Sequence, residues 1–550
     1  MSARKEIVAV LLILAAALLV RGWAMSGNTI DHFDEGVYSF SALGLADASQ
    51  PRVMYPNQEI FSPPVYFATG AALARAFGMA PDIALMWISI VFGALTVLVV
   101  WWFVRDEFGA AAGLTAAAIL AFNPFHIEFS RSALTDITFT FWFVLGIAAL
   151  VTAVERDSWK WAGIAGLVIG VAWNTKYHGW FALLIGGAAL VPYAWRLRAG
   201  RRNWVAPIQK WSGAALVAFL CYLPWMIYLR TRAGGYEALA RHYLGHLRTQ
   251  WFANFWRYGE ILAFFETPLG RVAVVAAPLV TFALIVRKPV AMSRMLVLFG
   301  FLALSALILG AAGTALLFSL IATPWLLRNK PTYRIWVLFA WASIWLLAAP
   351  VYNPYARLIL PFVVACSIGA AIGFMRLLRW YQEPDAGLVP ARLQWVMVPL
   401  FAVVLFLAGS GVPTGADPWR KRGMSEAAAA FSQHIPEGSR VIAMIEPTIA
   451  YYLHRNGRPA FERTSRFEIL DTLSTPAYVI TGTYVRRSPR LQKQLARRSK
   501  RLAPLATARI VPYDVRLLDD LTPAEAKRYR AHSDSTFDLR LYRYEPPVKR

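Results

Sequence analysis

The sequence predicts an α-helical polytopic membrane protein with about 13 transmembrane helices and a C-terminal external α/β domain. Two observations support this fold class. The 550 residues are 57% hydrophobic with a mean hydropathy of +0.45, which is above that of ordinary soluble domains. Apolar windows long enough to cross a bilayer also recur as far as residue 411, after which the chain becomes hydrophilic. We therefore expect a transmembrane domain over residues 1–412 and a soluble domain over residues 413–550.

Each predicted span is an apolar window of about 17–22 residues, with some shorter ones that could be tilted. The windows are 6–26, 83–104, 110–125, 137–153, 158–175, 179–196, 211–229, 271–286, 294–311, 313–327, 333–349, 356–377 and 393–411. Arg4 and Lys5 precede the first window, as in a signal peptide. The many later windows favour a retained first helix instead.

The distribution of Lys and Arg predicts the orientation of the bundle. Loops 195–211, 287–294, 328–334 and 376–392 are rich in basic residues, whereas the short loops between them are poor in these residues. Basic loops remain cytoplasmic, so we expect a cytoplasmic N-terminus and an external C-terminal domain. An odd number of spans satisfies both expectations.

Three hydrophilic or amphipathic segments lie outside the predicted spans, the last of them being the tail over residues 413–550. Residues 27–82 form a first external loop, and residues 230–270 have the spacing of an amphipathic helix on the membrane surface. Within the tail, residues 440–445 and 477–481 predict buried strands, whereas residues 425–434 and 489–501 predict helices.

The net charge of +24 does not require nucleic acid as a partner. A basic external domain beside anionic lipid accounts for this charge, so the lipid bilayer is the expected partner. Cys221 and Cys366 both fall in apolar windows, which indicates no disulfide framework.

An acidic cluster follows the first predicted span. Asp31, Asp34 and Glu35 lie within five residues, with Tyr38 one turn later. Carboxylates beside a hydrophobic span are costly to desolvate, which makes the cluster a candidate site. The alternative is an ordinary acidic first turn of a helix that begins near Asp34. Downstream, Pro63 and Pro64 precede an apolar helix too short to span the membrane.

A second polar cluster occupies the next external turn. His126, Glu128, Arg131 and Asp136 gather between two apolar windows. Asp136 could be an ordinary acid at a helix N-terminus, and His126 an interfacial histidine.

Two cations stand at the ends of other predicted spans. Lys176 lies in WNTKYHGW, and Arg357 lies in YNPYARLILP. Either side chain could simply reach the membrane interface. The functional alternative is that both bind a phosphate at the outer face, where an Arg fork and a Lys ammonium are suitable ligands.

These elements together resemble a known family. Arg21 before FDEGVYSF, then SPPVYF, the stretch from FGALTVLVVWW to SRSALTDITF, NTKYHGW and YARLILP occur in order. In this respect the chain resembles the GT-C glycosyltransferases of the protein O-mannosyltransferase and lipid A aminoarabinose transferase superfamily. Its predicted layout is also similar to that of the bacterial aminoarabinose and mannose transferases, which implies a bacterial plasma (inner) membrane.

The resemblance implies an inverting transfer of a sugar from a polyprenyl-phosphate donor at the external face. The acceptor would be an envelope lipid, a glycan or a protein hydroxyl. Asp34 would act as the base, Glu35 and Asp136 would position substrate, and Lys176 and Arg357 would hold the donor phosphate. Arg131, Tyr38, Tyr355 and His126 are further candidates for substrate binding.

The resemblance requires no cofactor, because basic residues can neutralise the phosphate. A divalent ion held by carboxylate oxygens remains an open alternative. His242 and His246 have the i, i+4 spacing of zinc ligands but lack an HExxH pattern, so a membrane-surface helix is favoured.

Two other functions compete with the transferase. A transporter or lipid flippase would also place charges in a helical bundle, but it predicts charges midway along spans and internal symmetry. A membrane scaffold would not need acids and phosphate-sized cation pairs.

Overall fold

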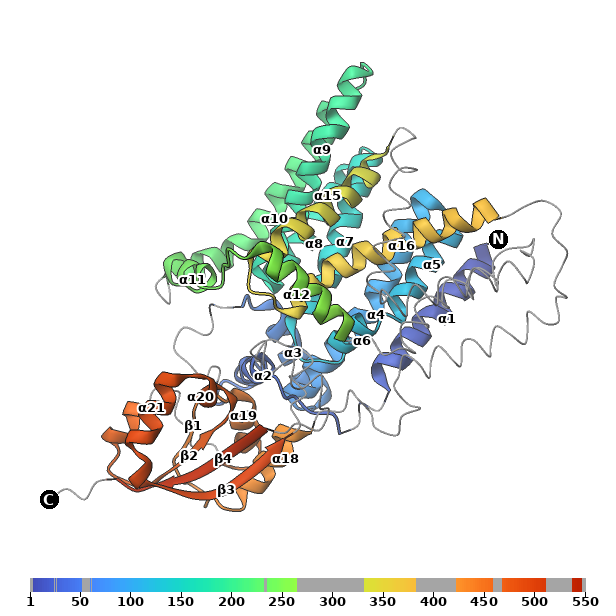
Figure 1. Cartoon of the computed structure of the whole chain (residues 1–550). Coiled ribbons are helices and arrows are strands. Elements are labelled where there is room, and N and C mark those ends of the chain that lie inside the picture. The colour runs from blue at the N-terminus through green and yellow to red at the C-terminus, as the bar shows by residue number, and fades with distance from the viewer. Residues whose placement is uncertain are drawn as a thin grey trace, which may run out of the picture. The chain divides into compact units, whose positions relative to one another are not determined.

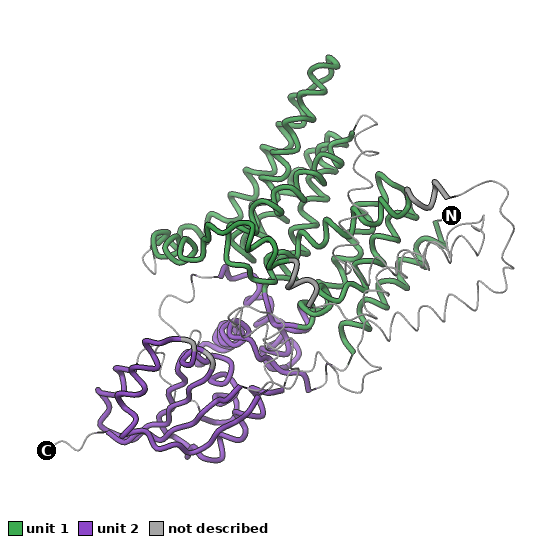
Figure 2. The backbone as a smooth tube through the Cα atoms, viewed as in Figure 1, with its two compact units in different colours: residues 1–23, 89–131, 135–418 green, residues 24–88, 132–134, 419–550 purple. Residues whose placement is uncertain are grey.

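A computed structural model describes residues 3–23, 25, 27–51, 60, 62–231, 235–264, 331–381, 422–458, 467–510 and 537–546. The chain forms two compact units, which are coloured separately in Figure 2. Unit 1 contains residues 1–23, 89–131 and 135–418, and unit 2 contains residues 24–88, 132–134 and 419–550. The predicted boundary between residues 412 and 413 lies outside the described residues.

The described secondary-structure elements of unit 1 are helices, apart from an isolated β-bridge between Leu247 and Tyr352 (Figure 1). Its helices are α1 (Ala3–Gly22), most of α4 (Pro81–Phe108), α5 (Ala110–Ala121), α6 (Pro124–Ser130), α7 (Thr135–Glu155), α8 (Trp159–Thr175), η2 (Tyr177–Trp180), α9 (Phe181–Ala199), α10 (Val205–Thr231), α11 (Gly235–Leu244), α12 (Trp251–Phe264), α15 (Tyr333–Ala348), η3 (Ala349–Val351), η4 (Ala356–Ile359) and α16 (Leu360–Tyr381). The predicted amphipathic segment 230–270 thus contains two helices in its described part, α11 and α12.

Several of these helices are long and apolar enough to cross a membrane. Within the described residues there are six, or seven if the bent pair α5 and α6 counts as one span. A multi-pass helical membrane protein is therefore confirmed, whereas the predicted number of about 13 spans is not. The predicted spans 271–286, 294–311, 313–327 and 393–411 lie outside the described residues.

The predicted span 110–125 is not one straight helix. It divides into α5 and α6, which are bent by 62° at the break. The Asn123 side chain caps α6 by accepting a hydrogen bond from the His126 N–H at 3.0 Å, and Pro124 occupies the first turn. An Asn cap followed by Pro starts a new helix, which accounts for the break.

Contacts within unit 1 identify the two ends of its helical bundle. Arg334, at the start of α15, pairs with Glu155 at the end of α7 at 3.1 Å and donates to the Phe103 carbonyl of α4 at 2.7 Å. Near the other end of α15, Trp345 packs against His178 of η2, with ring centroids 6.0 Å apart. The turn between α15 and α16 therefore lies at the end of the bundle where α7 begins and α8 ends.

Two of the four basic loops expected on one side meet at the first of these ends. Arg196, in the predicted loop 195–211, donates a hydrogen bond to the carbonyl of Pro331, in the predicted loop 328–334. Arg105, near the end of α4, pairs there with Glu6 near the start of α1. This clustering of basic residues agrees with the pattern expected of one membrane face.

Unit 2 combines helices with a small sheet of order β1-β2-β4-β3 (Figure 1). Its elements are α2 (Phe33–Ala46), α3 (Val65–Phe77), the start of α4, α18 (Gly423–Ser432), β1 (Val441–Ala443), α19 (Pro447–Arg455), η6 (Phe467–Thr472), β2 (Ala477–Thr481), α20 (Thr483–Arg487), α21 (Pro489–Arg497), η7 (Ser499–Arg501), β3 (Leu502–Ile510) and β4 (Phe537–Tyr544). Strands β1 and β2 are parallel, whereas β2 and β3 both pair antiparallel with β4.

The sheet confirms the predicted α/β character of the tail. The predicted strands 440–445 and 477–481 appear as β1 and β2, and the predicted helices appear as α18 and α21. Apolar side chains of both strands, among them Ile442 and Val479, pack with Phe467 and Leu491 in one core. The sequence reasoning missed α19, β3 and β4.

Candidate active site

The acidic cluster lies at the start of α2, which begins at Phe33, close to the predicted position. The Nδ1 atom of His32 accepts the Asp34 N–H at 3.1 Å. The Glu35 side chain in turn bonds the backbone before the helix: its Oε2 accepts the N–H groups of Asp31 at 3.0 Å and His32 at 2.9 Å. These reciprocal bonds form a capping box that fixes the first turn.

The two acids of the predicted pair differ in environment. Glu35 is fully buried, and its Oε1 accepts a third backbone N–H, that of Ala133, at 2.8 Å. Asp34 is half-buried. The interpretation as an ordinary helix-start acid therefore describes Glu35, whose carboxylate satisfies three buried donors. The predicted substrate-positioning role of Glu35 stays a prediction.

In unit 1, the predicted site residue Asp136 lies directly against a cation. Asp136, in the first turn of α7, pairs through Oδ1 with the ammonium of Lys176, which follows the last residue of α8. Asp136 is 1% exposed, and within the described part of the chain its Oδ2 is buried without a hydrogen-bond partner. The pair is preformed, and its free carboxylate oxygen can accept a further hydrogen bond.

A series of ring contacts leads from Lys176 toward Arg357. Tyr177, the next residue after Lys176, packs edge-on against Tyr243 of α11 with centroids 5.7 Å apart. Tyr243 packs against Tyr352 at 6.4 Å, and Tyr352 against Tyr355 at 6.2 Å. The Tyr355 ring lies 5.5 Å from the Arg357 guanidinium.

The two predicted phosphate ligands are therefore linked through aromatic side chains of unit 1. The sequence reasoning missed Tyr177, Tyr243 and Tyr352. The density of aromatic residues in WNTKYHGW and VYNPY was the signal that could have revealed them.

His246 adds a polar contact to this aromatic set. Its Nδ1 lies 3.4 Å from the Tyr355 hydroxyl, and its backbone carbonyl accepts the Asn353 N–H at 2.9 Å. The Arg248 N–H also donates to the Val351 carbonyl at 2.8 Å. The segment after α11 thus packs on the turn that carries Tyr355 and Arg357.

His126 and Arg131 both contact the end of α1. Arg131 donates to the carbonyls of Trp23 at 2.7 Å and Arg21 at 3.1 Å, which are among the acceptors left over where a helix ends. His126 is buried, with Nδ1 2.9 Å from the Arg21 guanidinium. These contacts give both residues a structural role, and their predicted substrate contacts stay predictions.

Tyr38 lies on α2 in an aromatic group with residues of α3. Its ring packs on Phe67 at 5.3 Å and Tyr66 at 6.1 Å, and Ser62 donates to its hydroxyl at 3.4 Å. The helix after Pro63 and Pro64 begins at Val65 and has 13 residues, in agreement with the predicted short apolar helix.

The structure identifies no metal site among the residues it describes. No three His, Cys, Asp or Glu side chains gather there in a way that could hold an ion. His242 and His246 lie close together, with ring centroids 4.9 Å apart, but without a third ligand of these types in the described regions. The proposed divalent ion stays a prediction.

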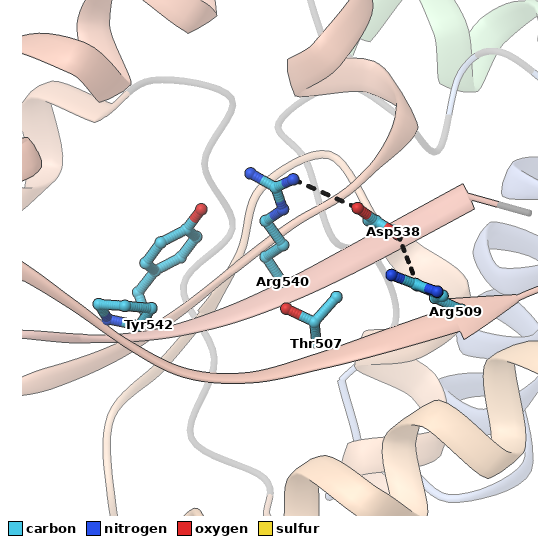
Figure 3. A pocket seen from close by; sticks show the side chains of 6 residues that line it. Thr507, Arg509, Asp538, Arg540 and Tyr542 are labelled. Atoms are coloured by element: carbon cyan, nitrogen blue, oxygen red, sulfur yellow. Dashed lines mark hydrogen bonds and ion pairs between the residues drawn. The ribbon is translucent and has the colours of Figure 1, made fainter.

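A separate groove of about 780 Å³ lies on the exposed surface of β3 and β4 (Figure 3). It is lined by Pro504, Thr507, Arg509, Asp538, Arg540 and Tyr542. Asp538 lies between two guanidinium groups, 3.2 Å from Arg540 and 3.8 Å from Arg509. These ion pairs are exposed, and none of the predicted site residues lines the groove.

Comparisons with known proteins agree with this architecture. Residues 62–228 match the family model of dolichyl-phosphate-mannose-protein mannosyltransferase. The matched region contains Asp136 and Lys176 but ends before Arg357 and begins after Asp34. No curated protein sequence matches the chain.

A solved structure of low sequence identity shares the fold. AglB, the archaeal oligosaccharyltransferase from Archaeoglobus fulgidus in complex with an inhibitory peptide and a dolichol-phosphate, has a TM-score of 0.55 and is 13% identical. That match covers 88% of this chain and 70% of AglB. Apo ArnT from Cupriavidus metallidurans matches over 98% of both chains at 16% identity and a TM-score of 0.46. The predicted resemblance to the GT-C glycosyltransferases is therefore confirmed, by the family model over residues 62–228 and by the fold.

Proposed function

We propose that this protein transfers a sugar from a polyprenyl-phosphate donor to an envelope lipid, glycan or protein acceptor at the external membrane face. Asp34 acts as the base, and the reaction inverts the anomeric carbon. Lys176 and Arg357 bind the donor phosphate, and Asp136 positions Lys176.

The observation that carries the proposal is the cationic site at one end of unit 1. Lys176 is held against buried Asp136, and a series of ring contacts that begins at its neighbour Tyr177 ends at Arg357, at the same bundle end. Because Asp136 neutralises much of the Lys176 charge, Arg357 must supply the additional positive charge that a phosphate needs. Aromatic rings between two cations also suit the apolar face of a sugar.

The chemical step is a single displacement. The acceptor hydroxyl oxygen attacks the anomeric carbon as the bond from that carbon to the phosphate oxygen breaks. The hydroxyl proton passes to the Asp34 carboxylate, and the bonding electron pair leaves with the phosphate. A phosphate leaving group needs no strong acid, so electrostatic stabilisation by Lys176 and Arg357 suffices.

A transporter would require a different distribution of charge. Asp136 lies in the first turn of α7, Lys176 at the end of α8, and Arg357 in the turn before α16. These ends of helices suit a reaction at the membrane surface, whereas a translocation path needs charges midway along the spans.

The test is donor consumption by the full chain in lipid nanodiscs, with an envelope extract as the source of acceptors. Undecaprenyl-phosphate mannose is the first probe, followed by other sugars on the same lipid. We expect release of undecaprenyl phosphate with one donor, and transfer of its labelled sugar to a lipid or protein fraction. Vesicle flipping of the donor without sugar transfer would contradict the proposal.

The external location is tested separately by labelling intact cells. Single cysteines at Ser41 and Ser425 should both react with a reagent that does not cross the membrane. Reaction at only one of them would exclude a shared external location of Asp34 and the tail.

A further inference from the structure

We propose that α19, in the C-terminal tail, positions the Asp34 turn for catalysis, with Thr448 and Tyr452 as positioning residues. The inference rests on the proposed function, because it assigns the tail a role in placing the base. Helices α2 and α19, both labelled in Figure 1, belong to unit 2, and a side chain of α19 contacts the backbone at the start of α2.

Two hydroxyl groups of α19 hold the backbone that leads into α2. The Thr448 hydroxyl donates to the His32 carbonyl at 2.6 Å, and the Tyr452 hydroxyl accepts the Ile30 N–H at 2.8 Å. Both hydrogen bonds are buried and join residues more than 400 positions apart. His32 is the cap residue whose side chain binds the Asp34 N–H, so a shift of its backbone would move Asp34.

The close approach of the two helices depends on Gly36. A Cβ atom added at this position would lie 2.5 Å from the Thr448 nitrogen and 2.7 Å from the Pro447 carbonyl carbon. Both neighbours are backbone atoms, which cannot rotate away. Only glycine therefore lets the first turn of α19 contact the helix that carries Asp34. Phe40, one turn further on, packs edge-on against Tyr451 at 5.4 Å.

A buried carboxylate in turn fixes α19. Asp82, 1% exposed, accepts the hydroxyls of Tyr451 at 3.0 Å and Tyr452 at 3.2 Å. Arg455 donates to both Asp82 oxygens at 3.1 Å. The Tyr452 hydroxyl thus donates to Asp82 while it accepts from Ile30, which uses both of its capacities.

A third contact of the tail reaches the same turn. The Asp31 carboxylate accepts the N–H of Met424, near the start of α18, at 3.1 Å. Residues 30, 31 and 32 are therefore each bonded to the tail, directly before the helix turn of Asp34. Such a set of buried bonds restricts the turn to one geometry, which a general base requires for proton transfer.

The experiment compares Thr448→Val, which removes the hydroxyl, with Thr448→Ser, which keeps it. Thr472→Val is the matched control, because its hydroxyl bonds locally to the Ile469 carbonyl at an exposed position. We expect Thr448→Val to lower kcat about three- to tenfold, as for loss of one hydrogen bond, with KM for the donor changed less than about twofold. Thr448→Ser and Thr472→Val should retain the parent kcat.

Hydrogen–deuterium exchange supplies a measurement that does not depend on activity. In the full chain, Thr448→Val should accelerate amide exchange in peptides that cover residues 30–40, whereas the two comparison variants should not. Equal exchange and equal kcat in Thr448→Val and Thr472→Val would overturn the positioning role. Full turnover by Asp34→Asn would instead refute the proposed base, whatever the exchange result.

Glycine substitutions provide a stronger perturbation of the same contact. Gly36→Ala should lower kcat more than Thr448→Val, because the added methyl pushes α19 away from α2. Gly163→Ala is its control, since a Cβ atom there meets nothing within 4 Å. Normal kcat and normal exchange in Gly36→Ala would contradict the role of α19.

Discussion

The two acidic regions of the candidate site are held in place by different kinds of contact. Asp136 lies on α7 and Lys176 directly follows α8, 40 residues later, and these two helices pack side by side. The Asp34 turn is bonded to Thr448 and Tyr452, which lie 416 and 422 residues away from their respective partners. The Asp136–Lys176 pair therefore needs only two neighbouring helices, whereas the Asp34 turn needs the C-terminal tail to be folded.

The cation site and the proposed base can therefore be perturbed independently. Substitutions at Asp136 and Lys176 should alter unit 1 and donor binding. Substitutions around α2 and α19 should alter the geometry of the base and the stability of unit 2.

The largest stability effect is expected where the buried ion pair is broken. Lys176→Met leaves the Asp136 carboxylate buried without its cation, which should lower the free energy of unfolding by about 3–5 kcal/mol. Adding Asp136→Asn removes the stranded charge and should restore most of the stability but not donor binding. Thermal unfolding in detergent measures both variants. Equal stability of Lys176→Met and the parent chain would show that the pair is not a buried structural contact.

Donor affinity should show the next largest effect. Arg357→Ala and Lys176→Ala should each weaken binding of the lipid-linked phosphate about ten- to a hundredfold, since a charge-assisted contact contributes about 1.5–3 kcal/mol. The double variant should be less than additive if both grip one phosphate, and Arg357→Lys should recover part of the loss. Binding is measured by titration of undecaprenyl phosphate. Unchanged affinity in both single variants would leave these cations as interfacial side chains.

Glu35→Gln should affect stability more than it affects chemistry. One amide oxygen cannot replace two carboxylate oxygens that accept three backbone N–H groups, so unfolding should become easier by about 1–3 kcal/mol. Turnover of the folded fraction should fall far less than in Asp34→Asn. A stable variant without activity would instead identify Glu35 as a catalytic group.

The smallest effect concerns pH and unit 2. Burial lowers the pKa of His454, whose Nε2 lies 2.8 Å from the Gln50 side-chain oxygen. The unfolded chain takes up the proton first, at about pH 6.5, so stabilisation present above that pH is lost as pH falls through the lower pKa of the folded state. His454→Gln should reduce the loss of Tm between pH 7 and pH 5. An identical pH dependence in this variant would exclude His454 as a contributor.

Periodicity and helix-start signals in the sequence were sufficient for the local structure. The start of α2, the helix after Pro64 and strands β1 and β2 all follow from nearby residues. The break between α5 and α6 was predictable from Asn123-Pro124 but was overlooked. The capping box was harder to recognise, because His32 stands where Ser or Thr is usual.

Contacts between residues far apart in the chain could not be predicted from the sequence. Asp82 gives no sign that it binds Tyr451, Tyr452 and Arg455, because these partners fold against it from the tail. Strand β3 was missed because Pro504 interrupts its pattern, and the structure accommodates this proline at an irregularity of an edge strand. The alternation in FDLRLYRY was a clear signal for β4 that was not used.

The role of Asp34 as the catalytic base is tested by Asp34→Asn. This substitution keeps the shape of the side chain and removes the base, so turnover should fall about 10²–10⁴-fold. Donor affinity, insertion and amide exchange of residues 30–40 should match the parent chain, which separates loss of chemistry from loss of fold. Single-turnover transfer from the labelled undecaprenyl-phosphate sugar is the measurement. Near-normal transfer by the purified, folded variant would show that Asp34 is not the base.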